Sequence, residues 1–210
     1  SREIKKTPQA MEQILSTIHG WGGKATDWSS LEIVSTGGVV HFYIRVQEKF
    51  KNLVESTIFS FYQNVDIKEV EDYAENIPSN NEDLYARGLD VWGTELVLDK
   101  EGIYPIRSYA EFNIGDSKEG EPSTHSDPLS VFVEIMGRIQ REETIGIQMI
   151  LMPVKSKAVK TKYKYLLDKF KPEKPKEGES PKPKTATEIK AQKAVEENLS
   201  KPMFNVLIRI

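Results

Sequence analysis

The sequence contains no cysteine, which excludes disulfide scaffolds, thiolate zinc sites and cysteine nucleophiles. Long hydrophobic runs are also missing: the most apolar stretch, Ile145 to Val154, has the length of a strand and cannot cross a bilayer. Histidine occurs only at His19, His41 and His125, and no two of these have the spacing of a metal-binding motif. These absences remove the commonest redox, thiol and metal chemistries.

A glycine-rich phosphate loop is missing as well. The pattern G-x-x-x-x-G-K-[ST] does not occur. Lys24 follows a group of glycines, but the next residue is Ala25 instead of Ser or Thr, and no strand pattern precedes the glycines. A dinucleotide-binding fingerprint is also lacking. His19 closes a predicted helix, where its charge suits the negative end, and this role is favoured over catalysis because no nucleophile accompanies it. We therefore expect a non-catalytic chain without cofactor or metal.

The charge is nearly balanced over the 210 residues, with 29 basic and 32 acidic side chains and a net charge of −3. Most of the lysine-rich sequence lies between Lys155 and Lys193, so the part before it is distinctly acidic. A chain without broad positive charge attracts nucleic acid only through a local patch.

An acidic run, Glu69, Glu71, Asp72 and Glu75, is the one group of carboxylates that resembles a cation site. A metal cage needs oxygens that converge from several elements. These carboxylates come from one predicted strand end and alternate between its sides, so a solvated strand end is favoured over a divalent-cation site.

Residues 1–76 have an alternating pattern of helix and strand signals, in which apolar residues recur at helical or two-residue spacing. The expected elements are a helix from Thr7-Pro8 to Gly20, strands at 31–35 and 39–46, a helix at about 48–62 and a strand at 65–70. With one more strand before Thr7, the order becomes βαββαβ, which is typical of a ferredoxin-like plait. We therefore predict a ferredoxin-like α+β module at 1–76.

The strands at 31–35 and 39–46 are predicted to form a hairpin, because Gly37-Gly38 accommodates the positive φ angles of a two-residue turn. That turn pairs Ser35 with Val40, so that one face of the hairpin is apolar. The residues expected on this face, beneath the helices, are Leu31, Ile33, Val40, Phe42 and Ile44. The residues expected on the other face are Glu32, Val34, His41, Tyr43 and Arg45.

Residues 77–210 predict a second α/β module. Its expected elements are strands at 91–98 and 104–109, a helix from Asp127-Pro128, a central strand at 144–152, helices near 159–170 and 188–200, and a final strand at 204–210. Between about 171 and 187, proline, lysine and glutamate replace large apolar residues, which is typical of a disordered or extended insertion. Because the last strand pattern stops abruptly and no initiator Met opens the chain, we expect a piece of a longer polypeptide.

The outer face of the hairpin carries a row of His41, Tyr43 and Arg45 at alternate positions. RNA-recognition motifs use aromatic and basic residues in this way to stack bases. The segment lacks the full signature of those motifs, and Glu32 lies opposite Tyr43. A solvated face or a protein contact surface is therefore favoured over nucleic-acid binding, and these three residues are the candidate partner-facing surface.

Several short segments, which together are spread along most of the chain apart from the Lys/Pro insertion, carry a resemblance to a known family. They are Lys6 to Glu12, Leu31 to Ser35, His41 to Arg45, Leu53 to Glu55, Glu69 to Tyr73, Trp92 to Leu96, Asp127 to Leu129 and Ile145 to Gln148. Together they resemble the N-terminal region that precedes the P-loop motor in type IV secretion and conjugative coupling ATPases of candidate-phyla bacteria. The resemblance implies a membrane anchor before this region, a DNA-translocating motor after it, and a location on the cytoplasmic side of the membrane.

From these observations we expect a non-catalytic assembly or scaffolding domain of such an ATPase. It would act through protein–protein contacts with the secretion machinery or with its own motor domain. The alternative is a nucleic-acid-binding module that guides the translocated strand. An independent enzyme is the weakest of the three hypotheses, because no catalytic motif is recognisable.

Overall fold

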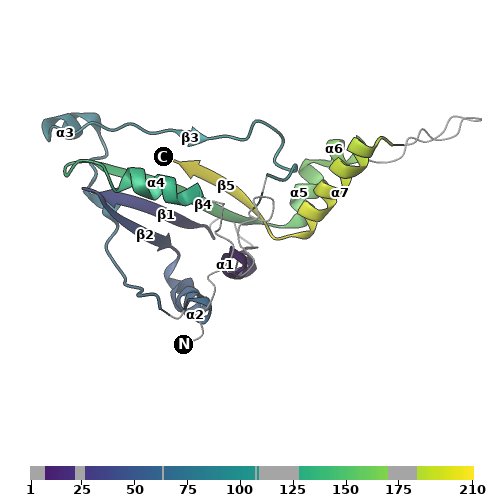
Figure 1. Ribbon diagram of the computed structural model, residues 1–210, viewed down its shortest axis with the longest axis horizontal. Helices are drawn as coiled ribbons and strands as arrows, with labels where there is room; N and C mark the ends of the chain where they lie inside the picture. Colours follow the sequence, from purple (N-terminus) through teal and green to yellow (C-terminus); the bar gives the residue numbers. More distant parts are fainter. Residues whose placement is uncertain (1–7, 22–26, 63, 107, 109–127, 170–183) are drawn as a thin grey trace, which may run out of the picture.

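The computed structural model describes residues 8–21, 27–62, 64–106, 108, 128–169 and 184–210 (Figure 1). Its strands are β1 (Ser29–Thr36), β2 (Val39–Arg45), β3 (Glu95–Leu96), β4 (Thr144–Val154) and β5 (Met203–Arg209). Its helices are α1 (Pro8–Trp21), α2 (Lys51–Phe61), α3 (Asn81–Ala86), α4 (Pro128–Met136), α5 (Ser156–Lys162), α6 (Lys164–Lys169) and α7 (Ala186–Ser200), with 3-10 turns η1 (Glu48–Phe50) and η2 (Tyr73–Asn76). The five strands form one antiparallel sheet in the order β2-β1-β4-β5-β3, so the predicted α+β class is confirmed.

The predicted hairpin is confirmed in its register. Ser35 pairs with Val40, and the ladder continues without a slip to the pair of Ser30 and Arg45. Gly37 and Gly38 have φ angles of 57° and 86°, which side chains with a Cβ rarely adopt. A Cβ on Gly38 would also lie 3.0 Å from the carbonyl oxygen of Gly137, so the turn needs glycine for space as well as for conformation.

One face of the sheet, here called the helix face, is covered only in part. Its members alternate along four strands and include Leu31, Ile33, Phe42, Ile44, Met149 and Ile208. The buried cluster of α1 and α2 packs against Ile44. At the hairpin end, Ser35 Oγ donates a hydrogen bond of 2.7 Å to the carbonyl oxygen of Met136, which places the end of α4 over the same face. The middle of this face lies between the two helical covers.

Phe42 corrects one prediction. It was expected beneath the helices, and it lies on the helix face, yet its side chain is 70% exposed. The reason is that α1 and α2 reach only the Ile44 end of β2. Alternation along a strand shows which side a residue faces, but it does not show how far along the strand the covering helix extends.

Two further strand predictions are wrong, and a third fails over the residues that the structure describes. Residues 65–70 form no strand, and the second neighbour of β1 is β4 instead. The strand expected at 91–98 is reduced to the two residues of β3. Residues 104–106 and 108 are not in a strand, whereas 107 and 109 lie outside the described residues. The ferredoxin-like topology is therefore not confirmed.

The later elements agree better with the sequence. The central strand, α4, α7 and the final strand all form close to the expected residues, and β4 lies between β1 and β5. Because β1 and β2 come from 1–76 and β4 and β5 from 77–210, the two predicted modules share one sheet. Most of the insertion expected at 171–187 falls in 170–183, outside the described residues.

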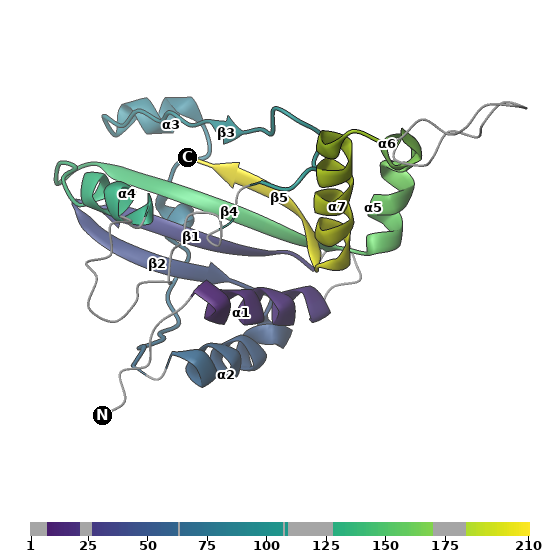
Figure 2. The same cartoon turned by 45° about the vertical axis from the view of Figure 1, so that its right-hand side comes forward.

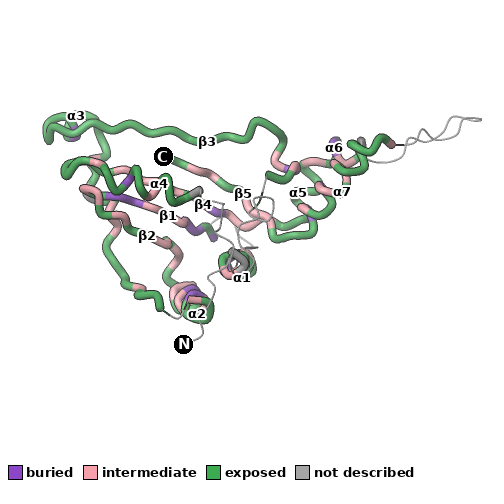
Figure 3. Tube along the Cα trace, in the orientation of Figure 1, coloured by how far each residue is buried: buried purple, intermediate pink, exposed green. Residues whose placement is uncertain are grey.

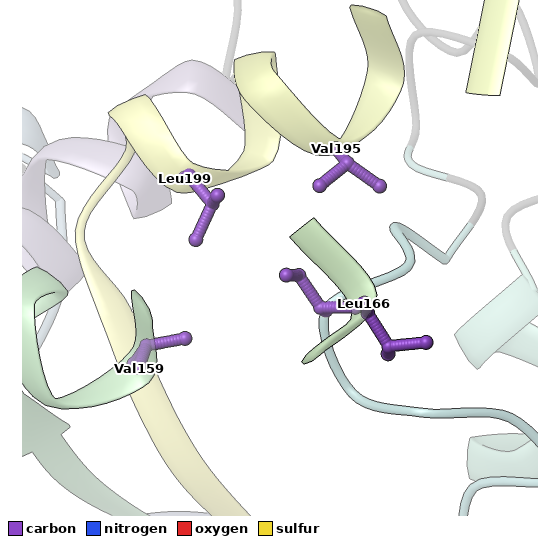
Figure 4. Close-up of a cluster of buried hydrophobic side chains, with 5 residues drawn as sticks. Val159, Leu166, Val195 and Leu199 are labelled. Carbon is purple, nitrogen blue, oxygen red and sulfur yellow. The ribbon is translucent and has the colours of Figure 1, made fainter. Parts of the chain in front are cut away.

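Helices α5, α6 and α7 gather beyond the ends of β4 and β5, apart from the helices of the helix face (Figures 1 and 2). Val159, Leu166, Val195 and Leu199 form their buried cluster, and the fully buried Ile103 is inserted into it from the loop after β3 (Figure 4). This small bundle has its own core and anchors that loop at one end of the sheet.

Candidate partner-facing surface of the sheet

The structure places His41, Tyr43 and Arg45 side by side on one face of β2, as the sequence predicts. This polar face also carries Glu32, Gln148 and Arg209 from the neighbouring strands. His41 and Arg45 are exposed, whereas Tyr43 is half-buried. The rings of His41 and Tyr43 lie 5.9 Å apart, centroid to centroid.

The row is not bare, because Asp72 and Tyr73 of the segment 64–77 contact it. We call this segment the strap; it joins α2 to α3, and its course can be followed in Figures 1 and 2. The ring of Tyr73 lies 5.4 Å from that of Tyr43. Asp72 forms an ion pair of 2.7 Å with Arg45. The Arg45 guanidinium also lies 5.5 Å from the centre of the Trp28 ring, close enough for a cation–π contact.

A buried carboxylate lies beneath the strap. Glu32 is only 6% exposed and has no ion pair among the described residues. Its two oxygens accept hydrogen bonds of 2.5 Å from Ser30 Oγ and from the Tyr73 hydroxyl. Gln148 Nε2 donates to that hydroxyl at 3.1 Å. Burial, and then the hydrogen bond to Glu32, raise the pKa of Tyr73 above its usual value of 10.

The acidic run that the sequence singled out is divided among different partners. Glu69 forms an ion pair of 2.6 Å with Lys51, and it raises the pKa of that ammonium group, while Asp72 binds Arg45. Within the described ranges, no three His, Asp or Glu side chains come together in a way that could hold a metal ion. His19 lies in the last turn of α1, where its Nε2 is 3.2 Å from the carbonyl oxygen of Val154. His125 is outside the described residues.

A second surface, which the sequence did not single out, follows the edge of the sheet at β3. We call it the β3 margin; its apolar side chains are all more than half exposed, and they are Val91, Trp92, Leu96, Val97, Leu98 and Ile106. Figure 3 shows the chain from the end of α3 through β3 as exposed. Trp92 and Val97 are 80% and 88% exposed. Five of these six side chains come from the eight residues 91–98, and exposed apolar patches mark interaction sites in soluble proteins.

Among the described residues, the outer side of β3 has no backbone partner. Thr94 and Ile210 exchange two hydrogen bonds, of 2.8 Å and 3.0 Å, so the backbone of Thr94 faces β5. In an antiparallel strand the neighbours of such a residue face the other way, which directs the N–H and C=O groups of Gly93 and Glu95 outward. In the described part of the sheet no strand lies beyond β3.

Sequence reasoning missed the strap and the β3 margin for different reasons. Tyr73 was not selected because its hydroxyl meets Glu32 only after folding, from 41 positions away. The apolar residues at 91–98 were recognised as a strand, but their exposure at an edge was not predicted. The consecutive apolar residues Leu96, Val97 and Leu98 place apolar side chains on both sides of a short strand, and they were the available signal for a contact surface at this edge.

The comparisons with known proteins identify a family. A family model described as "Domain of unknown function (DUF8128)" matches residues 2–210. No curated protein and no solved structure matches the chain. None of the described helices combines the length and the apolar character that crossing a bilayer requires.

Proposed function

We propose that this chain, which belongs to the DUF8128 family, is a non-catalytic assembly domain that acts through protein–protein contacts. The β3 margin carries this proposal. Trp92 and Val97 are largely exposed, and a partner that covered them would gain about 25 cal/mol of binding free energy for each Å² of apolar surface buried. An edge strand with such side chains also invites aggregation unless a partner covers it.

The identity of the machine rests on the sequence resemblance alone. We place the chain in a membrane-anchored type IV secretion or conjugative coupling ATPase, on the cytoplasmic side of the membrane and ahead of the P-loop motor. In that setting, its partner is either the motor domain or a subunit of the secretion machinery. The fold supports an assembly role because one rigid sheet displays both surfaces described above.

Site-specific photo-crosslinking tests this proposal in cells that produce the full-length ATPase. A crosslinking residue at Val97 is expected to capture the motor or a secretion subunit, identified by mass spectrometry. The same residue at Ile189, an exposed apolar position on α7 and outside the sheet, is the matched control. Equal capture from both positions, or capture of unrelated proteins only, contradicts the proposal.

The nucleic-acid alternative has one observation in its favour, the aromatic and basic row on β2. Three contacts weigh against it: Tyr43 already packs on Tyr73, Arg45 is neutralised by Asp72, and the buried carboxylate of Glu32 lies beneath. Phosphate contacts dominate nucleic-acid affinity, and they weaken as salt is added. We expect no salt-dependent binding of a labelled single-stranded DNA by fluorescence anisotropy, and binding at low salt would favour the alternative.

A further inference from the structure

The strap is attached to the rest of the protein mainly through side chains. Its contacts are the ion pairs of Glu69 and Asp72, the hydrogen bonds of Tyr73, and the packing of Ile67 against the α1–α2 cluster. Within the residues that the structure describes, no backbone–backbone hydrogen bond joins the strap to the sheet. Segments held in this way open at lower free energy than strands do, because opening breaks no ladder.

The surface beneath the strap is complementary to a particular pair of side chains. Arg45 supplies a cation for a carboxylate, and Tyr43 supplies a ring against which another aromatic ring packs. Glu32 accepts a hydrogen bond from one phenolic hydroxyl, and Gln148 donates a hydrogen bond to the same hydroxyl. Asp72 and Tyr73 satisfy all of these groups from adjacent positions in the sequence.

We propose that this surface is a binding site for an acidic segment of a partner protein in which a carboxylate directly precedes a tyrosine, as Asp72 precedes Tyr73 at the start of η2. Asp72-Tyr73 of the strap occupies the site until such a segment displaces it. The inference specifies one contact of the assembly role and rests on that proposed function. The commitment to an acidic tyrosine segment follows from charge complementarity with Arg45 and from the buried acceptor on Glu32, which an apolar segment would leave unpaired.

The attached strap has a quantitative consequence for the partner. A covalently linked competitor acts at a high effective concentration, on the order of millimolar for a short flexible connection. The apparent affinity of an external segment therefore falls in proportion to the fraction of molecules in which the site is open. Removing the two strap side chains should raise that affinity without any change in the site itself.

The experiment uses the whole chain and a labelled peptide that copies residues 69–77, Glu-Val-Glu-Asp-Tyr-Ala-Glu-Asn-Ile. A double variant, Asp72→Ala with Tyr73→Ala, opens the site. We expect it to bind the peptide at least about 10-fold more tightly than the wild type, as measured by fluorescence anisotropy. A second double variant, Asp83→Ala with Tyr85→Ala, removes an acid and an exposed tyrosine from α3 and should bind like the wild type.

Two changes show whether the binding uses the proposed contacts. Replacing the peptide tyrosine by phenylalanine should weaken binding by about 10-fold, because the buried Glu32 then loses a donor. Adding Arg45→Ala to the opened variant should weaken it by a similar factor. Unchanged affinity in both cases overturns the assignment.

The proposal is also overturned if the opened variant and the wild type bind the peptide equally. It is overturned as well if an opened variant with a native circular dichroism spectrum does not bind the peptide. Binding of single-stranded DNA without binding of the peptide replaces it with the nucleic-acid reading. If the opened variant is unfolded, hydrogen exchange of the wild type decides. The strap amides should exchange at least about 10-fold faster than those of β1, and equal protection contradicts a releasable strap. Failure of any of these tests leaves the Val97 crosslinks untouched, so the two proposals fail independently.

Discussion

Tyr73→Phe is the most informative single substitution, because it removes one hydroxyl and keeps the ring. In the wild type, this hydroxyl donates to the buried carboxylate of Glu32 and accepts from Gln148. A hydrogen bond to a charged group contributes about 1.5–3 kcal/mol. Tyr73 is only half-buried, so water can replace part of that contribution. We expect the free energy of unfolding to fall by about 1–2 kcal/mol.

Urea denaturation at neutral pH measures this loss, and an unchanged slope with urea shows that the compactness of the two states is preserved. Tyr85→Phe, on an exposed ring of α3, is the matched control and should change stability by less than about 0.5 kcal/mol. A change in the Tyr73 variant as small as in the control would refute the view that the hydroxyl satisfies Glu32.

The same hydroxyl predicts a pH dependence of known sign. The pKa of Tyr73 is raised in the folded protein, so folding favours the neutral phenol. The resulting stabilisation is fully present below the unfolded value of about 10 and is lost as the pH rises above it. The stability difference between the wild type and Tyr73→Phe should therefore shrink above pH 10. A difference that grows with pH would contradict the direction of the shift.

Three further stability measurements test the packing, each by urea denaturation. Tyr43→Ala should lower the free energy of unfolding by about 2 kcal/mol, because it removes ring contacts with two neighbours. Phe42→Ala should lower it by less than about 1 kcal/mol, because that side chain is exposed. The reverse order would show that a cover reaches Phe42. Gly38→Ala should cost more than about 1 kcal/mol, since its positive φ and the nearby carbonyl oxygen both oppose a Cβ; a neutral effect would mean that the turn can rearrange. Ile103→Ala should cost about 2–5 kcal/mol and Ile106→Ala less than about 0.5 kcal/mol, and similar values would contradict the insertion of the β3 loop into the helical bundle.

Local signals predicted this fold well where a turn or a cap fixes the backbone. Gly37-Gly38 specified the register of the hairpin, and the apolar run at 144–152 specified a central strand. The errors concern which segments become strands and which strands become neighbours. The strand at 65–70 was assigned because its residues alternate, but pairing β1 with β4 instead depends on contacts more than 100 positions apart, which no local pattern encodes.

The candidate site shows the same division. Alternation alone placed His41, Tyr43 and Arg45 on one face, because strand geometry leaves no other arrangement. What covers that face was not predictable, since Asp72 and Tyr73 lie at the start of the short 3-10 turn η2, whose position over β2 no local pattern encodes. The row was accordingly interpreted as open, whereas two of its three members are engaged by the strap.

The two proposed contact surfaces lie at opposite edges of one sheet, and this separation bears on an assembly role. The row belongs to β2 and the margin to β3, with β1, β4 and β5 between them. Four strand spacings of about 4.8 Å place the two edges roughly 19 Å apart. Segments bound at β3 and under the strap would therefore not overlap, and two different partner segments can be bound at once. Two separate attachments of this kind would restrict the rotation of a bound domain more than either contact alone.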